Sequence, residues 1–132
     1  LLYPGETGME EDNTLLVAEC AGRIDLDGIM KTVQTSDFMI HRFQFQELVL
    51  RELNRMEEKN GRIASVIYIL DLDGLKLDPS LISIVTGPYR ILWASCYTNY
   101  PEWINTTLIV NCPSFIGLLW KAISPLLPER TR

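Results

Sequence analysis

The pattern of apolar and polar positions divides the chain into strands and helices, and a dense apolar run lies near its middle. After the opening serine, residues 65–70 are all β-branched, aromatic or aliphatic, with no alternating polar positions. This pattern is typical of a buried strand that is covered on both faces in a parallel or mixed sheet. We therefore expect residues 65–70 to form the central strand, with the carboxylates of Asp71 and Asp73 at its carboxyl end.

Two further stretches predict strands, and the start of the chain predicts none. Residues 14–20 form a short apolar run, and residues 106–111 are rich in β-branched side chains, which indicates a second buried strand. Residues 1–13 instead combine Tyr-Pro-Gly, a further glycine and an acidic run. Such residues favour turns and solvated surface, so we expect no regular element there.

A long helix is predicted between a start at Thr35 or Ser36 and a stop at Gly61. Either hydroxyl can cap the first turn, where the acidic Asp37 is favoured by the helix dipole, and glycine commonly follows the last turn. Apolar side chains recur at helical spacing and define one buried face. They are Phe38, Phe45, Val49, Leu53 and Met56.

A second helical region follows the central strand. Asp78 is a suitable N-cap and is followed by proline at the first helical position, so a helix is expected from residue 79 to about residue 99. Gly87 and Pro88 fall inside this region. Proline removes a backbone hydrogen bond and crowds the preceding turn, which predicts a kink or a split.

Shorter helices are expected before the long helix and at the end of the chain. The first runs to about Val33 and is capped by Asp25 or Asp27, and the last runs from Phe115 to about Ile123. Strands and helices therefore alternate. This order predicts an α/β fold with right-handed crossovers in a mixed, largely parallel sheet.

Length, charge and cysteine content narrow the class of protein. A chain of 132 residues with 47% hydrophobic residues suits one domain with a single core. The net charge of −5 and the absence of any basic run argue against nucleic acid as a partner. Three separated cysteines in apolar surroundings, with no CxxC motif and a single histidine, indicate reduced thiols and no metal site. We find no signal peptide and no apolar run long enough to cross a bilayer, so a cytoplasmic protein is expected.

Two local features suggest catalysis. His41 is the only histidine, but a single histidine on a helix surface is usually structural when no positioned partner is evident. The pair Asp71 and Asp73 resembles the first motif of haloacid-dehalogenase-type phosphatases, which use one aspartate as nucleophile and the other as acid/base beside magnesium. Leu75 departs from that motif, and a short motif without its context is a weak signal. A magnesium-dependent phosphatase is therefore kept as an alternative.

Another resemblance extends over nearly the whole chain. Six segments occur in the order and spacing of CRAL-TRIO lipid-binding domains, and they look most like the phosphatidylinositol-transfer and tocopherol-associated branch. These segments are residues 3–8, 22–28, 70–75, 99–102, 109–115 and 123–127. The resemblance implies a twisted sheet flanked by helices around one apolar cavity, with no catalysis and no cofactor.

The implied function is the intracellular binding and transfer of a hydrophobic ligand between membranes. The ligand would be a phospholipid, phosphoinositide, or tocopherol-like or similar small molecule, and contact with a membrane surface would be transient and peripheral. A domain that keeps the fold but serves as a ligand-free scaffold or regulator is a further alternative. The protein partners are not predicted.

The resemblance also suggests ligand-binding residues. In phosphatidylinositol-binding members, the glutamate of the Tyr-Pro-Glu turn and a threonine near the end of the domain belong to the headgroup network, and Glu102 and Thr131 match them. Phosphatidylcholine-binding members use two hydroxyl residues on the central strand, where this chain has Val66 and Tyr68. Large apolar side chains could line the cavity, although most are expected to fill the core. Those candidates are Phe43, Phe45, Tyr68, Tyr89, Trp93, Phe115, Leu119 and Trp120.

Compared with typical members, the chain is short at both ends. We expect residues 1–132 to form a single, partial CRAL-TRIO domain without the preceding helices and without the gate helix and strand that follow. An open groove would expose apolar surface and favour association.

Overall fold

The computed structural model describes residues 3–6, 13–100 and 103–126 of the 132-residue chain. From β2 onward, each strand is followed by one or two helices, in agreement with the α/β order that the sequence predicts. The strands are β1 (Tyr3–Glu6), β2 (Thr14–Glu19), β3 (Ser65–Asp71) and β4 (Ile104–Val110). The helices are α1 (Leu26–Thr32), α2 (Thr35–Asn60), α3 (Pro79–Thr86), α4 (Pro88–Asn99) and α5 (Ile116–Ile123), with short 3-10 turns at Ala21–Arg23 and Ser124–Leu126.

The four strands form one mixed sheet in the order β1-β2-β3-β4. Strands β2, β3 and β4 are parallel, and β1 is antiparallel to β2. Strand β3 is flanked on both sides, so the expected central position is confirmed. The register pairs Val17 with Tyr68 and Glu19 with Leu70, which places these side chains on one face of the sheet.

Strand β1 corrects the expectation that the start of the chain forms no element. Its residues pair with Leu15–Ala18 even though they include Pro4 and Gly5. Proline is tolerated on an edge strand, where one side of the backbone makes no ladder hydrogen bonds. The turn-forming residues of this segment therefore led to the wrong prediction that it contains no strand.

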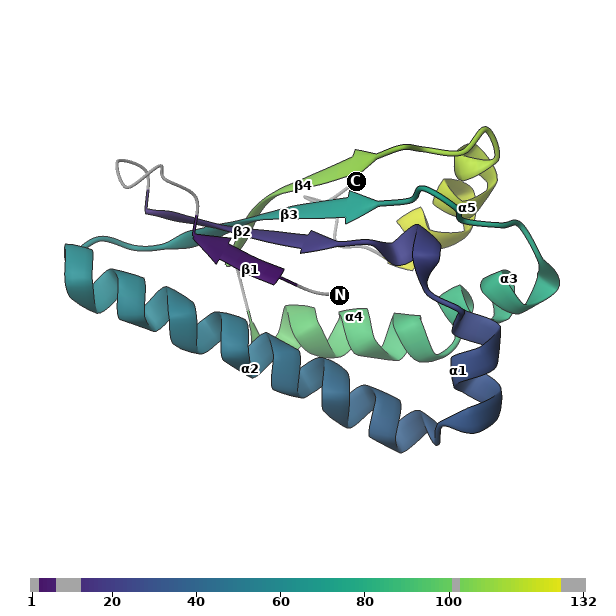
Figure 1. The fold of residues 1–132 in the computed structure, drawn as a ribbon, viewed down its shortest axis with the longest axis horizontal. Coiled ribbons are helices and arrows are strands. Elements are labelled where there is room, and N and C mark those ends of the chain that lie inside the picture. Colours follow the sequence, from purple (N-terminus) through teal and green to yellow (C-terminus); the bar gives the residue numbers. More distant parts are fainter. Residues whose placement is uncertain (1–2, 7–12, 101–102, 127–132) are drawn as a thin grey trace.

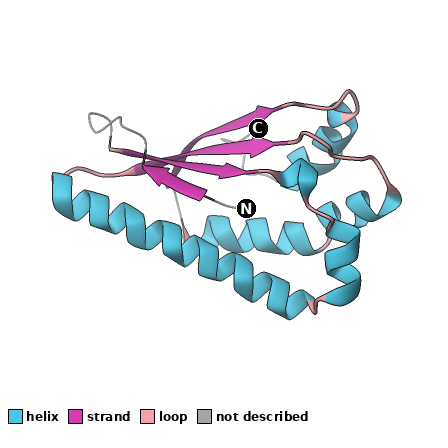
Figure 2. Cartoon of the chain, in the orientation of Figure 1, coloured by secondary structure: helices cyan, strands magenta, loops and turns pink. Residues whose placement is uncertain are grey.

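Helices α2 and α4 lie against one face of the sheet (Figure 1), so that these two helices and the strands form two layers (Figure 2). The main core lies between these layers. It contains Leu15, Val17, Phe45, Val49, Leu53, Ala64, Val66 and Tyr68. On the opposite face, the side chains of Leu16, Ile67 and Ile69 are only half-buried. The described helices thus cover one face of β3 rather than both faces.

Strand β4 is the edge of the sheet within the described part of the chain, and this corrects the expectation of a second buried strand. Leu108 is 46% exposed, and Ile109 and Val110 are exposed to a similar degree. A run of β-branched residues predicts that a segment forms a strand, but the burial of that strand depends on the elements that pack beside it.

The local signals that begin and end helices are mostly confirmed. Gly61 ends α2 in the left-handed conformation with φ 64°, and the Asp78 side chain accepts a hydrogen bond from the backbone N–H of Leu81 at 2.8 Å. The helical region after β3 is split at Gly87 into α3 and α4. The start of α2 differs, because Gln34 precedes the first helical residue and its side chain makes no capping bond.

Candidate functional site

An apolar cavity of about 310 Å³ lies between the carboxyl-terminal half of the sheet and helices α3, α4 and α5. All but three of its lining residues are aliphatic or aromatic. The lining residues are Glu19, Ala21, Leu26, Leu70, Leu72, Leu75, Leu81, Val85, Tyr89, Arg90, Trp93, Thr107, Ile109, Ile116, Leu119 and Trp120. Apolar pockets with a few polar groups are the usual form of a small-molecule site, and this volume is at the low end of the common range of about 300–1,000 Å³.

The parallel register brings residues from distant parts of the chain to the cavity. Leu70 pairs with Ile109, and Tyr68 pairs with Thr107, so these side chains share the face that α4 covers. The turn after β2 lies close to the end of β3. A Cβ added to Gly22 would lie 2.3 Å from the carbonyl oxygen of Asp73, so only glycine allows this approach.

A buried ion pair lies where β2 meets α2. Arg42 donates from Nη1 to Oε1 of Glu19 at 2.9 Å and from Nη2 to Oε2 at 3.0 Å, and the two residues are 5% and 4% exposed. The Tyr68 hydroxyl also donates to Oε2 of Glu19. Such a bidentate pair with an additional donor compensates much of the cost of burying two charges.

The environment of these groups shifts their pKa values. Burial alone lowers the pKa of Arg42, but the charge and hydrogen bonds of Glu19 outweigh this effect, and the pKa lies above its usual value. Burial and the neighbouring Glu19 carboxylate both raise the pKa of Tyr68. Arg42 therefore stays cationic and Tyr68 stays neutral at physiological pH.

Aromatic rings extend from this ion pair along the cavity. Tyr68 and Trp93 meet edge to face, with ring centroids 6.4 Å apart and an interplanar angle of 74°. Tyr89 lines the cavity from the first turn of α4, and burial raises the pKa of its hydroxyl. These rings give the cavity a mostly apolar wall with a polar end.

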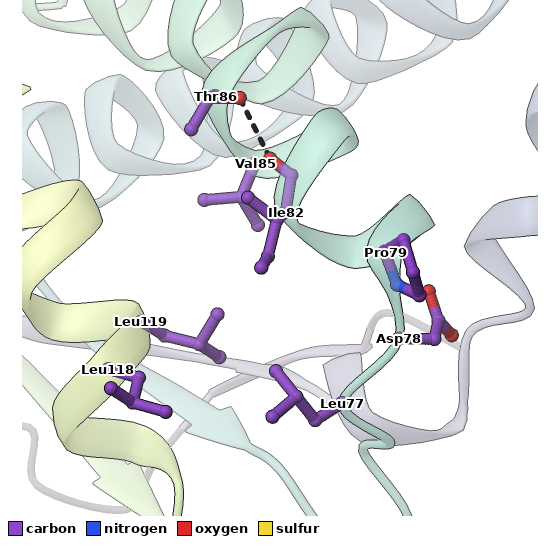
Figure 3. A pocket seen from close by; sticks show the side chains of 8 residues that line it. All are labelled: Leu77, Asp78, Pro79, Ile82, Val85, Thr86, Leu118 and Leu119. Atoms are coloured by element: carbon purple, nitrogen blue, oxygen red, sulfur yellow. Dashed lines mark hydrogen bonds between the residues drawn. The ribbon is translucent and has the colours of Figure 1, made fainter.

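A groove of about 500 Å³ lies beside the cavity, between α3 and α5. Figure 3 shows Ile82 and Val85 of α3 opposite Leu118 and Leu119 of α5, with Leu77 nearby. Val85 and Leu119 also line the cavity. The groove and the cavity therefore adjoin at these two side chains.

The comparisons with known proteins agree with this architecture. The model of the CRAL/TRIO domain matches residues 10–132. The chain belongs to the CRAL-TRIO family. CRAL-TRIO domains bind hydrophobic lipid ligands, and members of the family generally bind and transfer ligands rather than catalyse reactions.

Curated relatives resemble most of this CRAL-TRIO chain but are much longer. The CRAL-TRIO domain-containing protein F28H7.8 of Caenorhabditis elegans is 38% identical over 128 residues, which are 97% of this chain and 31% of the relative. Protein real-time of Anopheles gambiae is 29% identical over 84% of this chain and 16% of its own length. The CRAL-TRIO domain-containing protein C34C12.6 of C. elegans is 28% identical over 91% of this chain and 31% of its own length. The chain thus spans a third or less of these relatives.

The apolar candidates for the CRAL-TRIO ligand site occupy different places. Trp93 and Leu119 line the cavity, as do Tyr89 and Trp120. Phe45 belongs to the core between the sheet and α2, and Phe115 is half-buried immediately before α5.

The polar candidates and the central-strand positions are also separated. Tyr68 lies beside the cavity through its contacts with Glu19 and Trp93, whereas Val66 is fully buried in the core. Glu102 and Thr131 lie outside the described residues.

Several cavity residues were not predicted from the sequence. Glu19 ends an apolar strand at the position two residues after Val17, so alternation along the strand could have indicated that it points inward. Leu26 and Ile109 carry no such local signal. They reach the cavity through the fold, and aliphatic side chains in a strand or helix are common everywhere in a core.

Asp71 and Asp73, the alternative catalytic pair, make structural contacts. Oδ1 of Asp71 accepts hydrogen bonds from Asn111 Nδ2 at 2.8 Å and from the backbone N–H of Asp73 at 2.9 Å, and these bonds lower the pKa of Asp71. Asp73 pairs with Arg23 at 3.0 Å on the surface. These contacts fix the turn after β3 against the turns after β2 and β4.

Within the described residues, no helix is long and apolar enough to cross a membrane.

Proposed function

We propose that this CRAL-TRIO domain binds a phospholipid, phosphoinositide or tocopherol-like lipid and carries it between membranes without chemical change. The observation that carries the proposal is the apolar cavity of about 310 Å³ between the sheet and α3–α5. Each methylene that is removed from water contributes about 0.8 kcal/mol, so even one acyl chain provides substantial binding free energy. The proposed setting is the cytoplasm, with transient peripheral contact to membranes.

The groove between α3 and α5 is the proposed route into the cavity. It adjoins the cavity at Val85 and Leu119, and its outer wall includes the exposed Ile82 and Leu118, which are 47% and 62% exposed. Apolar residues exposed around an opening favour contact with a lipid surface. Movement of two side chains would connect the groove with the cavity.

The headgroup would lie towards the exposed end of the cavity. Arg90 is exposed and lines the cavity, so its guanidinium offers a cation for a phosphate group. Within the phosphatidylinositol-transfer and tocopherol-associated branch, Glu102 and Thr131 would add contacts to an inositol headgroup. The absence of a hydroxyl at Val66 makes a phosphatidylcholine site less favourable than an inositol lipid site.

The experiment combines binding and transfer. The chain is incubated with liposomes that contain phosphatidylcholine, phosphatidylinositol and α-tocopherol, reisolated, and extracted for lipid mass spectrometry, while transfer between donor and acceptor liposomes is followed with a fluorescent lipid. Bound lipid at near-stoichiometric amounts is the expected result. Extraction of no lipid at any liposome composition would refute the proposal.

A matched pair of variants links binding to the cavity. Val85→Phe adds volume at the boundary between groove and cavity and is expected to reduce bound lipid several-fold. Ser83→Phe places the same side chain on the exposed face of the same helix and should bind as the wild type does. Equal loss of lipid in both variants would argue against this cavity as the site.

A further inference from the structure

Glu19 is the only acidic side chain among the described residues that line the cavity. It is 4% exposed, whereas the side chains of Arg90 and Trp120 at the same cavity are exposed to solvent. This contrast gives the cavity an inner, dry end at Glu19 and an outer end near Arg90. A carboxylate is a strong acceptor in such a dry environment, because water does not compete for its hydrogen bonds.

The hydrogen bonds of Glu19 leave one acceptor position open. A carboxylate offers about four lone-pair positions on its two oxygens. Oε2 accepts from Arg42 Nη2 and from the Tyr68 hydroxyl, whereas Oε1 accepts only from Arg42 Nη1 among the described residues. Oε1 therefore keeps a lone pair for one further hydrogen bond, and Glu19 belongs to the lining of the cavity.

The charge of this ion pair restricts which ligand group can use that position. Glu19 and Arg42 neutralise each other, and both terminal nitrogens of Arg42 already donate to Glu19. Arg42 is not among the residues that line the cavity, so an anionic group there would meet the Glu19 carboxylate and not the buried Nε of Arg42, which has no hydrogen-bond partner among the described residues. An ether or ester oxygen would find no donor in Glu19, whereas a hydroxyl or N–H group could donate a charge-assisted hydrogen bond.

We propose that Glu19 is the polar anchor at the inner end of the cavity and selects ligands whose hydrocarbon body carries a neutral hydrogen-bond donor, such as a hydroxyl group. Arg42 is the positioning residue that holds the carboxylate in place through two hydrogen bonds, and the Tyr68 hydroxyl occupies one lone pair of Oε2. The inference deepens the proposed lipid-binding function and rests on it. The inner end of the cavity thereby recognises a donor, independently of any headgroup that lies at the outer end.

Two isomeric probes and one anion test the inference on the whole chain. The probes are 1-tetradecanol, its isomer 1-methoxytridecane, which lacks the donor, and tetradecanoate. Binding is measured by the change in tryptophan fluorescence, because Trp93 and Trp120 line the cavity. A hydrogen bond to a charged acceptor predicts that the alcohol binds about tenfold more tightly than the ether. Tetradecanoate at neutral pH should bind more weakly than the alcohol.

Variants assign the selectivity to the carboxylate. The double variant Glu19→Gln/Arg42→Met removes both charges together and should lower the alcohol-to-ether affinity ratio to about one, with ether binding retained. Tyr68→Phe leaves the carboxylate in place and frees one of its lone pairs, so the tenfold preference should persist. If the double variant does not fold, the wild type and Tyr68→Phe still decide the question.

The outcomes separate this inference from the proposed function. Equal affinity of the wild type for alcohol and ether would overturn the role of Glu19 and leave lipid binding intact. Loss of the preference in Tyr68→Phe would assign recognition to the tyrosine hydroxyl and also overturn the inference. No binding of any probe, together with no lipid extracted from liposomes, would overturn both.

Discussion

Removal of Arg42 alone is expected to destabilise the domain far more than removal of its whole ion pair. In Arg42→Met, the Glu19 carboxylate stays buried with only the Tyr68 hydroxyl as a donor. Breaking a buried pair in this way costs about 3–5 kcal/mol. The total stability of a domain is about 5–15 kcal/mol, so the change removes a large share of it.

The double variant Glu19→Gln/Arg42→Met should recover most of this loss. Replacing both charges removes the cost of desolvating them, and such replacements are often neutral or stabilising. The buried Nε of Arg42 has no hydrogen-bond acceptor in the part of the chain that the structure describes, so methionine also removes an uncompensated donor. We expect the double variant to lie within about 2 kcal/mol of the wild type.

Urea unfolding followed by tryptophan fluorescence measures these differences. For a slope of about 1.5 kcal/mol per molar urea, the loss in Arg42→Met lowers the midpoint by about 2–3 M. Arg55→Met on the same helix is the control, because the Arg55 pair with Glu52 is exposed and should contribute at most about 1 kcal/mol. A double variant that is as unstable as Arg42→Met would refute the reasoning, as would an Arg42→Met midpoint equal to that of the control.

Two further predictions concern the turn after β2 and the alkaline stability. Gly22→Ala should destabilise the domain by about 1–3 kcal/mol, because the added Cβ would overlap the backbone of Leu72 and Asp73. Gly117→Ala in α5 should stabilise it by about 0.5–1 kcal/mol, because the added Cβ meets no atom within 4 Å. Equal melting temperatures of the two variants would contradict this contrast. Burial and the hydrogen bond to Glu47 raise the pKa of Tyr100 to about 12. The neutral hydroxyl therefore contributes fully to stability below the unfolded pKa of about 10, and this contribution is lost as the pH rises towards 12. Urea midpoints between pH 8 and 12 should fall less steeply in Tyr100→Phe than in the wild type, and unchanged steepness would show that this hydroxyl does not titrate as expected.

The sequence predicts those parts of the fold that depend on neighbours in the chain. Caps and breaks such as Asp78, Gly61 and Gly87 act within one helical turn, and the structure confirms all three. The apolar character of β3 also identified the centre of the sheet. Local patterns therefore define most elements and their order.

Features that depend on residues far apart in the chain could not be predicted from local sequence patterns. The pairing of Pro4 with Val17 makes β1 a strand, and the lack of a described neighbour beyond β4 exposes Leu108. Glu19 is held in the cavity wall by Arg42, which lies 23 residues further along the chain. A charge at a strand end usually predicts solvent exposure, because a buried charge requires a partner that the local sequence does not reveal.

The parallel order of β2, β3 and β4 has a consequence for how the polypeptide acquires its structure. Tyr68 contacts Glu19 across 49 residues of chain, so β2 cannot complete its pairing with β3 until the whole of α2 has been synthesised. Such non-local pairings slow folding because a long loop must close before the contacts form. During this delay α2 is the element that can form first from local contacts, so it would act as the surface on which β2 and β3 assemble.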